Sequence, residues 1–502
     1  MAAGLSLEEL RALARGDLST EKPNSRFLAH TFSMLLHMRP RTYLRGSTWF
    51  THTFRLGYFT TFFFVVEIVT GLILMVYYRP TPDGAYASIL KIMSQAPFGS
   101  LIRDIHRLAA EGMVVCAVLH LLRTFLTASY KGRRAFTWLT GVVLLVFTLG
   151  MSFSGYLLPW DQMSYWAVTI GTSMAESIPV WGREINLLLR GAAEIGAEGL
   201  LRFYLLHVLL LPLLTIVFLA VHYYRVARIH GISLPAYVEE GDVPVSLKEE
   251  ANEKVPFLPE LFTHEVLLAF LGILVLVAMA VFFYDAPLEH QADPRLTPLD
   301  TQAPWFFLWV QGLQKLGDKM WMGVMVPSGV LALLLAVPYI DRNPRRMLKK
   351  RPMALGLATA AILSLSVLTY MGNHHYGISL PPATRILQDV APEEGIGLLR
   401  RVPYDQLIPG VYVTGVADDA SLPSALAEVL HDFGGRVEAA QADGAMVNAR
   451  SLVMIEEWQA DLKKVTLRIL WTDSESGESK SLDREIYMHR HTSNQEKWDP
   501  AR

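Results

Sequence analysis

The chain has 502 residues, of which 52% are hydrophobic and only 18% are charged, and its formal net charge at pH 7 is −2. Soluble chains carry about 25% charged residues, and several apolar runs here reach the roughly 20 residues of a membrane-crossing helix. The composition therefore excludes a soluble globular protein, and it gives no indication of nucleic-acid binding. Cys116 is the only cysteine, so no internal disulfide can form and no C-x-x-C-H haem-attachment motif occurs.

Seven segments are apolar and long enough to cross a bilayer, which predicts an all-α polytopic membrane protein. They cover residues 54–78, 102–127, 136–157, 201–226, 262–284, 319–340 and 353–372. The polar stretch before them is amphipathic near 27–44 and contains no recognisable cleavable signal peptide. Pro212 lies inside the fourth segment, where a packed bundle is expected to tolerate a kink.

The last part of the chain, residues 373–502, is polar and contains no membrane-spanning run. A helical pattern at 422–433, an alternating strand at 465–471, a turn at 472–479 and a return strand at 482–488 predict a small α+β soluble domain after a linker. The predicted domains are an N-terminal segment, a four-span region, a three-span region and this soluble region, with bounds 1–52, 53–235, 236–372 and 373–502.

Basic residues concentrate in alternate loops, which predicts the orientation of the chain in the membrane. They lie between spans two and three, after span four, and between spans six and seven: Lys131, Arg133, Arg134, Arg225, Arg228, Arg342, Arg345, Arg346, Lys349, Lys350 and Arg351. This side, with the N-terminus, is expected to be cytoplasmic. Seven spans then place the C-terminal domain on the opposite, positive side.

Four histidines lie in two matched pairs on the second and fourth spans: His106 with His120, and His207 with His222. Separations of 14 and 15 residues place the members of a pair roughly 21–22 Å apart along a helix and within roughly 40–60° of the same face. The two helices run in the same direction, so His106 is expected opposite His207, and the other two histidines opposite each other. Each opposed pair leaves room for a flat iron porphyrin. Hydrogen bonding between helices would explain one intramembrane histidine better than two matched pairs.

Glycines repeat the histidine interval on the first and third spans. Gly57 and Gly71 lie 14 residues apart, as do Gly141 and Gly155. A glycine allows a backbone to approach a large planar group closely, although small residues also mediate ordinary helix packing in membranes. The shared interval favours clearance for two porphyrins.

Arginines next to the histidines are candidate partners for haem propionates, because a guanidinium binds carboxylates well. Arg103 and Arg107 flank His106. Arg123 lies three residues after His120, and Arg225 lies three residues after His222. The alternative for each arginine is that it extends its side chain to the membrane interface.

These residues carry a resemblance to the cytochrome b/b6 family, over about residues 25–372. The motifs are His106-Arg107, His120-Leu-Leu-Arg123, Lys131-Gly-Arg-Arg134, Thr137-Trp138, Gly155-Tyr156-Leu157-Leu158-Pro159-Trp160-Asp161-Gln162, Arg190-Gly191 and Arg202-Phe203-Tyr204-x-x-His207. The 15-residue spacing and Pro159-Trp160-Asp161-Gln162 are more similar to the b6 branch than to the mitochondrial one. Residues 256–372 resemble subunit IV, fused here into the same chain, and the stretch 292–299 matches its loop between spans five and six.

The resemblance implies the core of a quinol:acceptor oxidoreductase in a bacterial inner membrane. Quinol would be oxidised near the positive side, with one electron passing to a Rieske iron–sulfur protein and then a c-type cytochrome. The other electron would cross two non-covalent b-type haems, held by His106/His207 and His120/His222, to a quinone on the negative side, with proton translocation. Contact with membrane lipid and a homodimeric complex are implied as well. The residues themselves predict the haem pair and its polarity, whereas bifurcation comes from the resemblance.

Two positions depart from the family pattern. Arg55 stands where the b6 branch attaches an extra haem through a cysteine, so no covalent third haem is expected. The Pro-Glu-Trp-Tyr signature of the quinol site corresponds to Ala303-Pro304-Trp305-Phe306, which keeps the tryptophan and lacks the acid. Quinol oxidation needs a base within hydrogen-bond reach, and Glu289, His290 and Asp300 are the candidates in the same loop.

The missing acid leaves a second interpretation open. The chain would then be a non-bifurcating, quinone-coupled di-haem anchor for a different periplasmic oxidoreductase. A transporter or channel with buried histidines is a further class, which haem spectra would eliminate. For residues 373–502 a structural or assembly role is favoured over docking of a redox partner.

Overall fold

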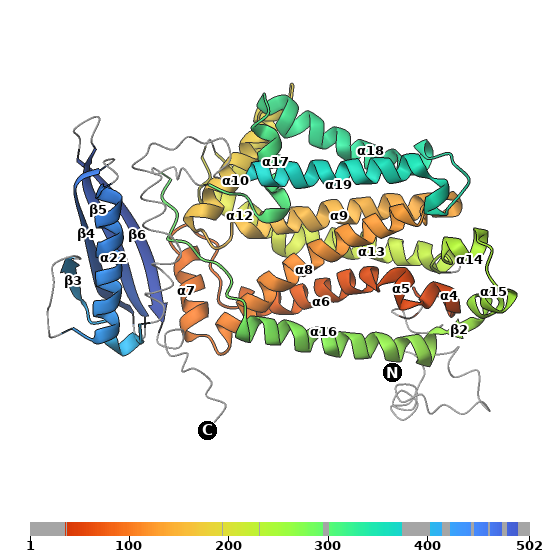
Figure 1. Ribbon diagram of the computed structural model, residues 1–502, viewed down its shortest axis with the longest axis horizontal. Helices are drawn as coiled ribbons and strands as arrows, with labels where there is room; N and C mark the ends of the chain where they lie inside the picture. The colour runs from red at the N-terminus through yellow and green to blue at the C-terminus, as the bar shows by residue number, and fades with distance from the viewer. Residues whose placement is uncertain are drawn as a thin grey trace. The chain divides into compact units, whose positions relative to one another are not determined.

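The computed structural model describes residues 36, 38–192, 194–229, 231–294, 301–373, 402–413, 422–442, 446–459, 462–473 and 479–489. The chain divides into two compact units (Figure 1). The helical unit comprises Met1–Trp160, Ser164–Ala286 and Pro298–Tyr376. The second unit comprises Asp161–Met163, Pro287–Thr297 and Gly377–Arg502.

Seven helical segments of the described residues are long and apolar enough to cross a membrane, which confirms the predicted number and order. They are Leu56–Met75 (α6), Gly99–Leu126 (α8), Gly132–Tyr156 (η1 and α9), Ala197–Arg228 (α12, η2 and α13), Phe257–Phe282 (η3 and α16), Trp321–Ile340 (η5 and α18) and Pro352–Gly372 (α19). Their outer surface is apolar: in α16, Phe270 is 65% and Val275 is 60% exposed. An exposed apolar surface of this kind is typical of helices that face lipid.

The fourth span accommodates Pro212 without a break. A π-helical turn, Leu206–Leu210, widens the helix directly before α13 (Leu211–Arg228), and Pro212 falls in the first turn of α13. A local π-helical turn is one way in which a membrane helix accommodates the backbone hydrogen bond that a proline cannot donate. The sixth span has the same arrangement, with a π-helical turn at Trp321–Met325 before Pro327.

The helices pack in pairs. Helix α6 packs along α8 and α9 along α13, while α16 lies on α8 and α18 on α9. Helix α17 (Leu308–Gln314) packs so closely on α19 that a Cβ at Gly312 would overlap the carbonyl of Leu368. A two-stranded sheet of β1 (Thr42–Leu44) and β2 (Lys254–Pro256) joins the N-terminal segment to the start of the fifth span.

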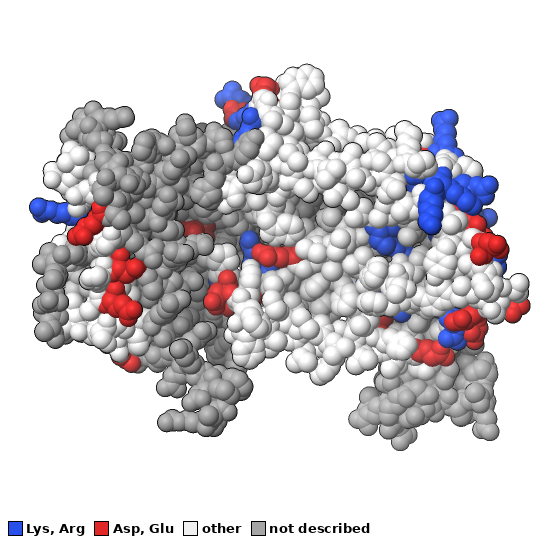
Figure 2. Space-filling view, in the orientation of Figure 1, with Lys and Arg blue, Asp and Glu red and all other residues white. Residues whose placement is uncertain are grey.

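Short helices complete the helical unit. They are α4 (Arg45–Thr48), α5 (Phe50–Thr53), α7 (Ala85–Gln95), α10 (Gln162–Ala175), α11 (Gly182–Arg190), α14 (Ala236–Glu240) and α15 (Val245–Asn252). Figure 2 shows charged side chains gathered at the end of this unit where α14 and α15 lie, next to a broad uncharged surface over the spanning helices. The charge distribution is that of a membrane protein with one strongly polar end.

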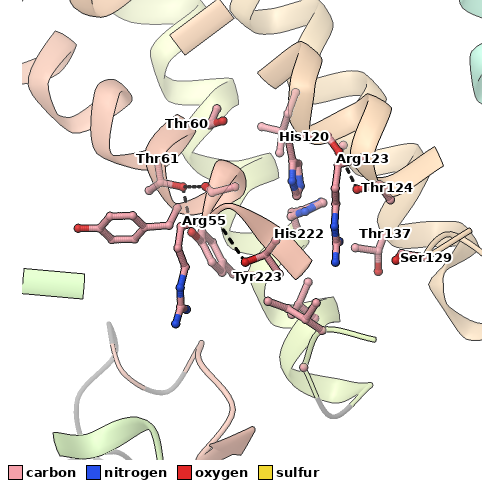
Figure 3. A pocket seen from close by; sticks show the side chains of 18 of the residues that line it. Arg55, Thr60, Thr61, His120, Arg123, Thr124, Ser129, Thr137, His222 and Tyr223 are labelled. Atoms are coloured by element: carbon pink, nitrogen blue, oxygen red, sulfur yellow. Dashed lines mark hydrogen bonds between the residues drawn. The ribbon is translucent and has the colours of Figure 1, made fainter. Parts of the chain in front are cut away.

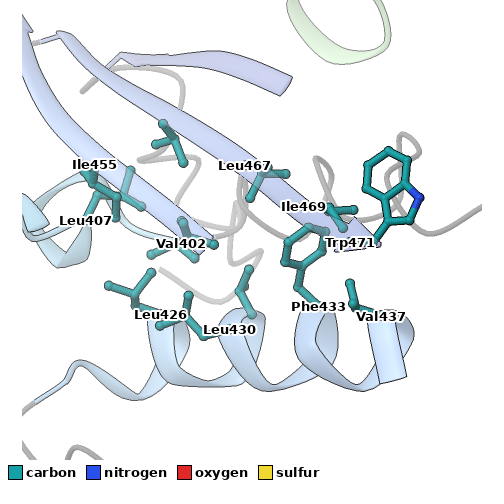
Figure 4. Close-up of a cluster of buried hydrophobic side chains, with 13 residues drawn as sticks. Val402, Leu407, Leu426, Leu430, Phe433, Val437, Ile455, Leu467, Ile469 and Trp471 are labelled. Atoms are coloured by element: carbon teal, nitrogen blue, oxygen red, sulfur yellow. The ribbon is translucent and has the colours of Figure 1, made fainter. Parts of the chain in front are cut away.

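The second unit contains an antiparallel sheet in the order β3 (Gly410–Val413), β4 (Met446–Gln459), β5 (Leu462–Asp473) and β6 (Ser479–His489). Helix α22 (Ser424–Ala442) packs across one face of this sheet and buries Phe433 against Leu467 and Ile469 (Figure 4). The predicted α+β fold is confirmed, with its helix and two of its strands. Strand β4 was not predicted, because Leu452 and Met454 on its other face are also apolar and remove the alternation on which strand prediction depends.

Candidate functional site

The first histidine pair lies across the bundle, between α8 and the π-helical turn before α13. The ring centres of His106 and His207 are 6.2 Å apart, and the ring planes are 81° to each other. A metal ion bound by both rings at about 2 Å per bond would hold the ring centres about 6 Å apart. The two imidazoles are therefore at a spacing at which both could bind one metal ion.

The second pair, His120 and His222, lies further along the same bundle, on α8 and α13. His120 and His222 line one cavity, and Figure 3 shows their rings close together in it. Thr61 and Tyr223 form another part of the wall and share a hydrogen bond of 2.9 Å between their hydroxyl oxygens. The structure thus brings the four histidines together in the pairs that their spacing predicted.

Hydrogen bonds fix the outer nitrogen of three of these rings. Nδ1 contacts Thr70 Oγ1 in His106 (2.8 Å), Thr140 Oγ1 in His222 (2.9 Å) and the carbonyl oxygen of Met151 in His207 (2.9 Å). Histidines that ligate metals typically donate Nδ1–H to such an acceptor, which orients the ring and leaves Nε2 for the metal. These contacts leave Nε2 of each ring available to hold a metal ion.

Each of the four predicted glycines faces a different histidine. A Cβ on Gly57 would lie 3.0 Å from His120, and one on Gly71 would lie 3.3 Å from His106. For Gly141 the distance to His222 would be 3.4 Å, and a Cβ on Gly155 would overlap His207. The glycines leave room for the rings at both levels, as the shared interval indicated.

The arginines near the first pair are held in different ways. Arg103 is buried and donates from Nη1 to the carbonyl oxygen of Ala286 at 2.7 Å. Arg107 forms a 3.1 Å ion pair with Glu111 and lies over the ring of Tyr156, at 5.3 Å. Arg107 is therefore held by groups that a propionate could replace, whereas Arg103 also supports the chain after α16.

The arginines near the second pair lie beside the cavity. Arg123 donates to the carbonyl oxygen of His52 at 2.8 Å, and burial together with Arg123 lowers the pKa of His52 to about 4. Arg225 lies 5.2 Å from the Phe136 ring, and its buried Nε has no hydrogen-bond partner within the described part of the chain. A buried guanidinium with a free donor suits an anionic group such as a propionate.

An ion pair that the sequence did not indicate lines the same cavity. Arg39 contacts Glu265 through two N–O distances of 3.2 Å, and its guanidinium lies 4.4 Å from the Tyr223 ring. Burial alone would lower the pKa of Arg39, but Tyr223 and Glu265 raise it above its ordinary value. A charge inside a predicted span, Glu265, was the available signal.

Acidic residues also lie near the first pair, and the sequence analysis did not identify them. The carboxylate of Glu67 is 3.1 Å from Nδ1 of His106. Glu111 accepts a hydrogen bond from the hydroxyl of Tyr284 at 3.3 Å, and burial together with Glu111 raises the pKa of Tyr284 to about 12. Both glutamates interrupt apolar spans, so intramembrane charge was again the available signal.

The residues proposed for quinol oxidation fall in different units. Trp305 is 46% exposed in the helical unit and begins the short helix Trp305–Phe307. In the second unit, Glu289 donates its backbone N–H to Asp161 at 3.1 Å, and the carbonyl of His290 accepts the backbone N–H of Gln162 at 2.9 Å. Asp300 lies outside the described residues. The Asp161-Gln162 motif thus holds the loop that carries two of the candidates.

Within the described residues, no group of three or more His, Cys, Asp and Glu side chains could enclose a metal ion by itself. A metal held by two histidines needs its remaining ligands from another source, and a porphyrin supplies four nitrogens in one plane. The facing pairs, the glycines opposite them and the unpartnered Arg225 Nε are each consistent with a haem at that place.

Comparisons with known proteins agree with this geometry. Residues 42–230 match the family described as cytochrome b/b6/petB, and residues 291–387 match cytochrome b(C-terminal)/b6/petD. Cytochrome b6 of Heliobacterium mobile is 47% identical over 180 residues, which are 36% of this chain and 84% of that protein. Cytochrome b6 of Heliobacterium modesticaldum (strain ATCC 51547 / Ice1) is 42% identical over the same shares. A solved chain described as hyperthermophilic respiratory Complex III is 26% identical with a TM-score of 0.59, covering 70% of this chain and 89% of that one.

Proposed function

Because this chain belongs to the cytochrome b/b6 family, we propose that it is the di-haem cytochrome b subunit of a quinol:electron-acceptor oxidoreductase. It would carry electrons across the membrane between two quinone sites, with proton translocation. The observation that supports this most directly is the presence of two facing histidine pairs at two depths of one bundle.

The residues that would hold the haems have distinct tasks. His106 and His207 would ligate one haem, and His120 and His222 the other, while the glycine opposite each ring keeps the space open. Each haem, when bound, supplies a one-electron iron couple. Arg103, Arg107, Arg123 and Arg225 would bind propionates, and burial together with Arg123 lowers the pKa of His52 beside them.

The cavity at the second pair suits quinone reduction. Arg39 and Glu265 lie in one cavity with His120 and His222, so a quinone headgroup there would be close to an electron donor. Reduction of a quinone to quinol needs two protons, and Glu265 and the hydroxyl of Tyr223 are groups that can hold a proton at the cavity wall. Arg55 also lines this cavity and offers no thiol, so we propose no covalent third haem.

We place the cavity end on the cytoplasmic side of a bacterial inner membrane. Lys131, Arg346 and Arg351 lie in the loops beyond this end of the spans, and basic loops favour the cytoplasm. The first pair would then lie nearer the positive side, with the C-terminal domain periplasmic. A Rieske protein, a c-type cytochrome and a second copy of the complex are the proposed partners.

A non-bifurcating membrane anchor for another oxidoreductase is the second candidate. It is favoured by Pro304 and Phe306, which offer no base at the expected quinol site. Purification of the intact complex separates the two candidates. A Rieske cluster in the complex, detected by electron paramagnetic resonance, is expected for the first, and a stable complex without one would contradict it.

The haem assignment itself is tested by absorption spectroscopy. Purified protein is expected to contain two b-type haems per chain with bis-histidine spectra and two midpoint potentials. Protein that binds no haem would overturn the proposed function and would return a transporter or channel to consideration.

A further inference from the structure

The cavity beside the second histidine pair carries an excess of positive charge. Its lining within the described part of the chain includes four arginines, Arg39, Arg55, Arg123 and Arg134, and one carboxylate, Glu265. A cavity whose walls carry mostly one sign of charge attracts ligands of the opposite sign. The cavity as a whole therefore favours an anionic ligand.

Three of these arginines are already engaged. Arg39 is paired with the carboxylate of Glu265 at 3.2 Å. Arg123, which is proposed above for a haem propionate, donates to a backbone carbonyl at 2.8 Å. Arg134 donates from Nη2 to a backbone carbonyl at 3.2 Å. The remaining arginine of the lining is Arg55.

Arg55 directly precedes α6, and its guanidinium has no ion pair within the described residues. Its Nη2 donates to the carbonyl oxygen of Thr48 at 3.2 Å, and the residue is half-buried in the cavity wall (Figure 3). Burial lowers the pKa of Arg55, and Glu265 offsets only part of this effect. A guanidinium binds an anionic oxygen through charge-assisted hydrogen bonds, and Arg55 has further N–H donors for one.

The backbone at Arg55 adopts an unfavourable conformation. Phe54 has φ 47° and ψ 18°, and Arg55 has φ 52° and ψ 23°, so two successive residues are left-handed between α5 and α6. A residue with a Cβ adopts this region at a cost in free energy that glycine does not incur, and such strain is concentrated at functional sites. The turn alone would favour glycine, so the arginine side chain contributes something that the turn does not require.

We infer that Arg55 is a substrate-binding residue that selects quinone headgroups carrying an anionic oxygen. This inference rests on the proposed function, which puts a quinone in this cavity. A hydroxyquinone that is ionised at neutral pH carries such an oxygen, and a quinone acquires one when it takes up one electron before a proton. The guanidinium would bind that oxygen more strongly than a neutral carbonyl. The phosphate of an anionic phospholipid offers the same chemistry, and the test below separates the two sources.

The test is isothermal titration calorimetry of the intact, oxidised complex with two naphthoquinones that share one alkyl tail. One has a ring hydroxyl that is ionised at neutral pH, and the other has a methyl group in its place. In Arg55→Gln, we expect the dissociation constant of the hydroxynaphthoquinone to rise by about tenfold, the usual scale of one lost hydrogen bond to a charged group. The dissociation constant of the methyl compound should change by less than about threefold.

A second variant and a control separate anion binding from a role in the turn. Arg55→Gly keeps the left-handed turn accessible and should weaken binding of the hydroxynaphthoquinone as much as Arg55→Gln does. Arg45→Gln, which loses an exposed ion pair with Glu253, is the control and should leave both dissociation constants unchanged.

Equal affinity for the hydroxynaphthoquinone in Arg55→Gln, Arg55→Gly and the unaltered protein would overturn the inference and leave the proposed function intact. Displacement of that compound from the unaltered complex by phosphatidylglycerol micelles would also overturn it, because a lipid phosphate would then be the anion at Arg55. Failure of a complex with both haems to bind either naphthoquinone would instead overturn the proposed quinone site, and the inference with it.

Discussion

The two histidine levels use the same ligands in different surroundings. At each level a histidine of α8 faces one of the fourth span, with a glycine of α6 and a glycine of α9 opposite the rings. The first level adds the buried carboxylate of Glu67, whereas the second lines a cavity with Arg39 and Glu265. Ligand identity defines what each level binds, and the neighbouring charges distinguish what each level does.

Removal of one histidine ligand should produce the largest difference in haem content between the two levels. In His120→Ala, we expect the haem at His120/His222 to be lost and the other haem to remain, because the levels share no ligand. Haem content per chain and the reduced absorption spectrum measure this. His264→Ala, an exposed histidine of α16, is the control and should keep both haems. Retention of both haems in His120→Ala would refute the pairing.

A methyl group added opposite the His207 ring should lower haem occupancy at the first level alone. A Cβ at Gly155 would overlap His207, so in Gly155→Ala the ring must move, and we expect haem occupancy at His106/His207 to fall by about half or more. Gly150→Ala is the matched control on the same helix, because its Cβ would lie at an ordinary 3.5 Å from Leu211. Equal occupancy in the two variants would contradict the clearance role.

Loss of the acid in the cavity should affect quinone chemistry at the second level. In Glu265→Gln, we expect oxidation of the haem at His120/His222 by added quinone to slow by about 100-fold, the usual scale of a lost acid–base group. Stopped-flow absorption measures this rate. Glu253→Gln, which only loses an exposed ion pair with Arg45, should leave it unchanged. An unaltered rate in Glu265→Gln would place quinone reduction elsewhere.

The smallest expected effect is on stability, at a charged cluster beyond the second level. Arg351 is 1% exposed and donates to Asp341 at 2.8 Å and to Tyr130 at 2.7 Å, and Tyr130 also lines the cavity. Asp341→Asn should lower the free energy of unfolding by about 3 kcal/mol, because it leaves the guanidinium charge buried without a counter-charge. Thermal unfolding in detergent measures this, with Asp318→Asn as the exposed control.

The same cluster predicts a pH dependence of stability. Burial alone would raise the pKa of Asp341, but hydrogen bonds from Tyr130, Lys131 and Arg351 hold it below its ordinary 3.8. A lowered pKa means that the unfolded chain binds the proton more readily. The contribution of Asp341 is therefore complete above pH 3.8 and is lost as the pH falls through the lower folded-state pKa. An Asp341→Asn variant with the same acid sensitivity as the unaltered protein would contradict this.

Much of the helical unit followed from local pattern. Apolar run length predicted the seven spans, since a bilayer requires about 20 residues per helix. The depth of the four histidines followed from a fixed rise per residue, so a separation of 14 or 15 residues defined two levels before any packing was known. The depths of Gly57 and Gly71 followed in the same way, because the same rise per residue applies to every helix.

The tertiary structure decided which charges meet. Glu67 reaches His106 from a different helix, and Arg39 reaches Glu265 across 226 positions of the chain. Such contacts depend on the rotation of each helix about its axis and on the loops that order the bundle, and neither is encoded in a local period. For the same reason the hydrogen bond from Arg103 to the carbonyl of Ala286 could not be predicted. The sequence by itself therefore determined where the histidines lie, and only packing determined the charges that surround them.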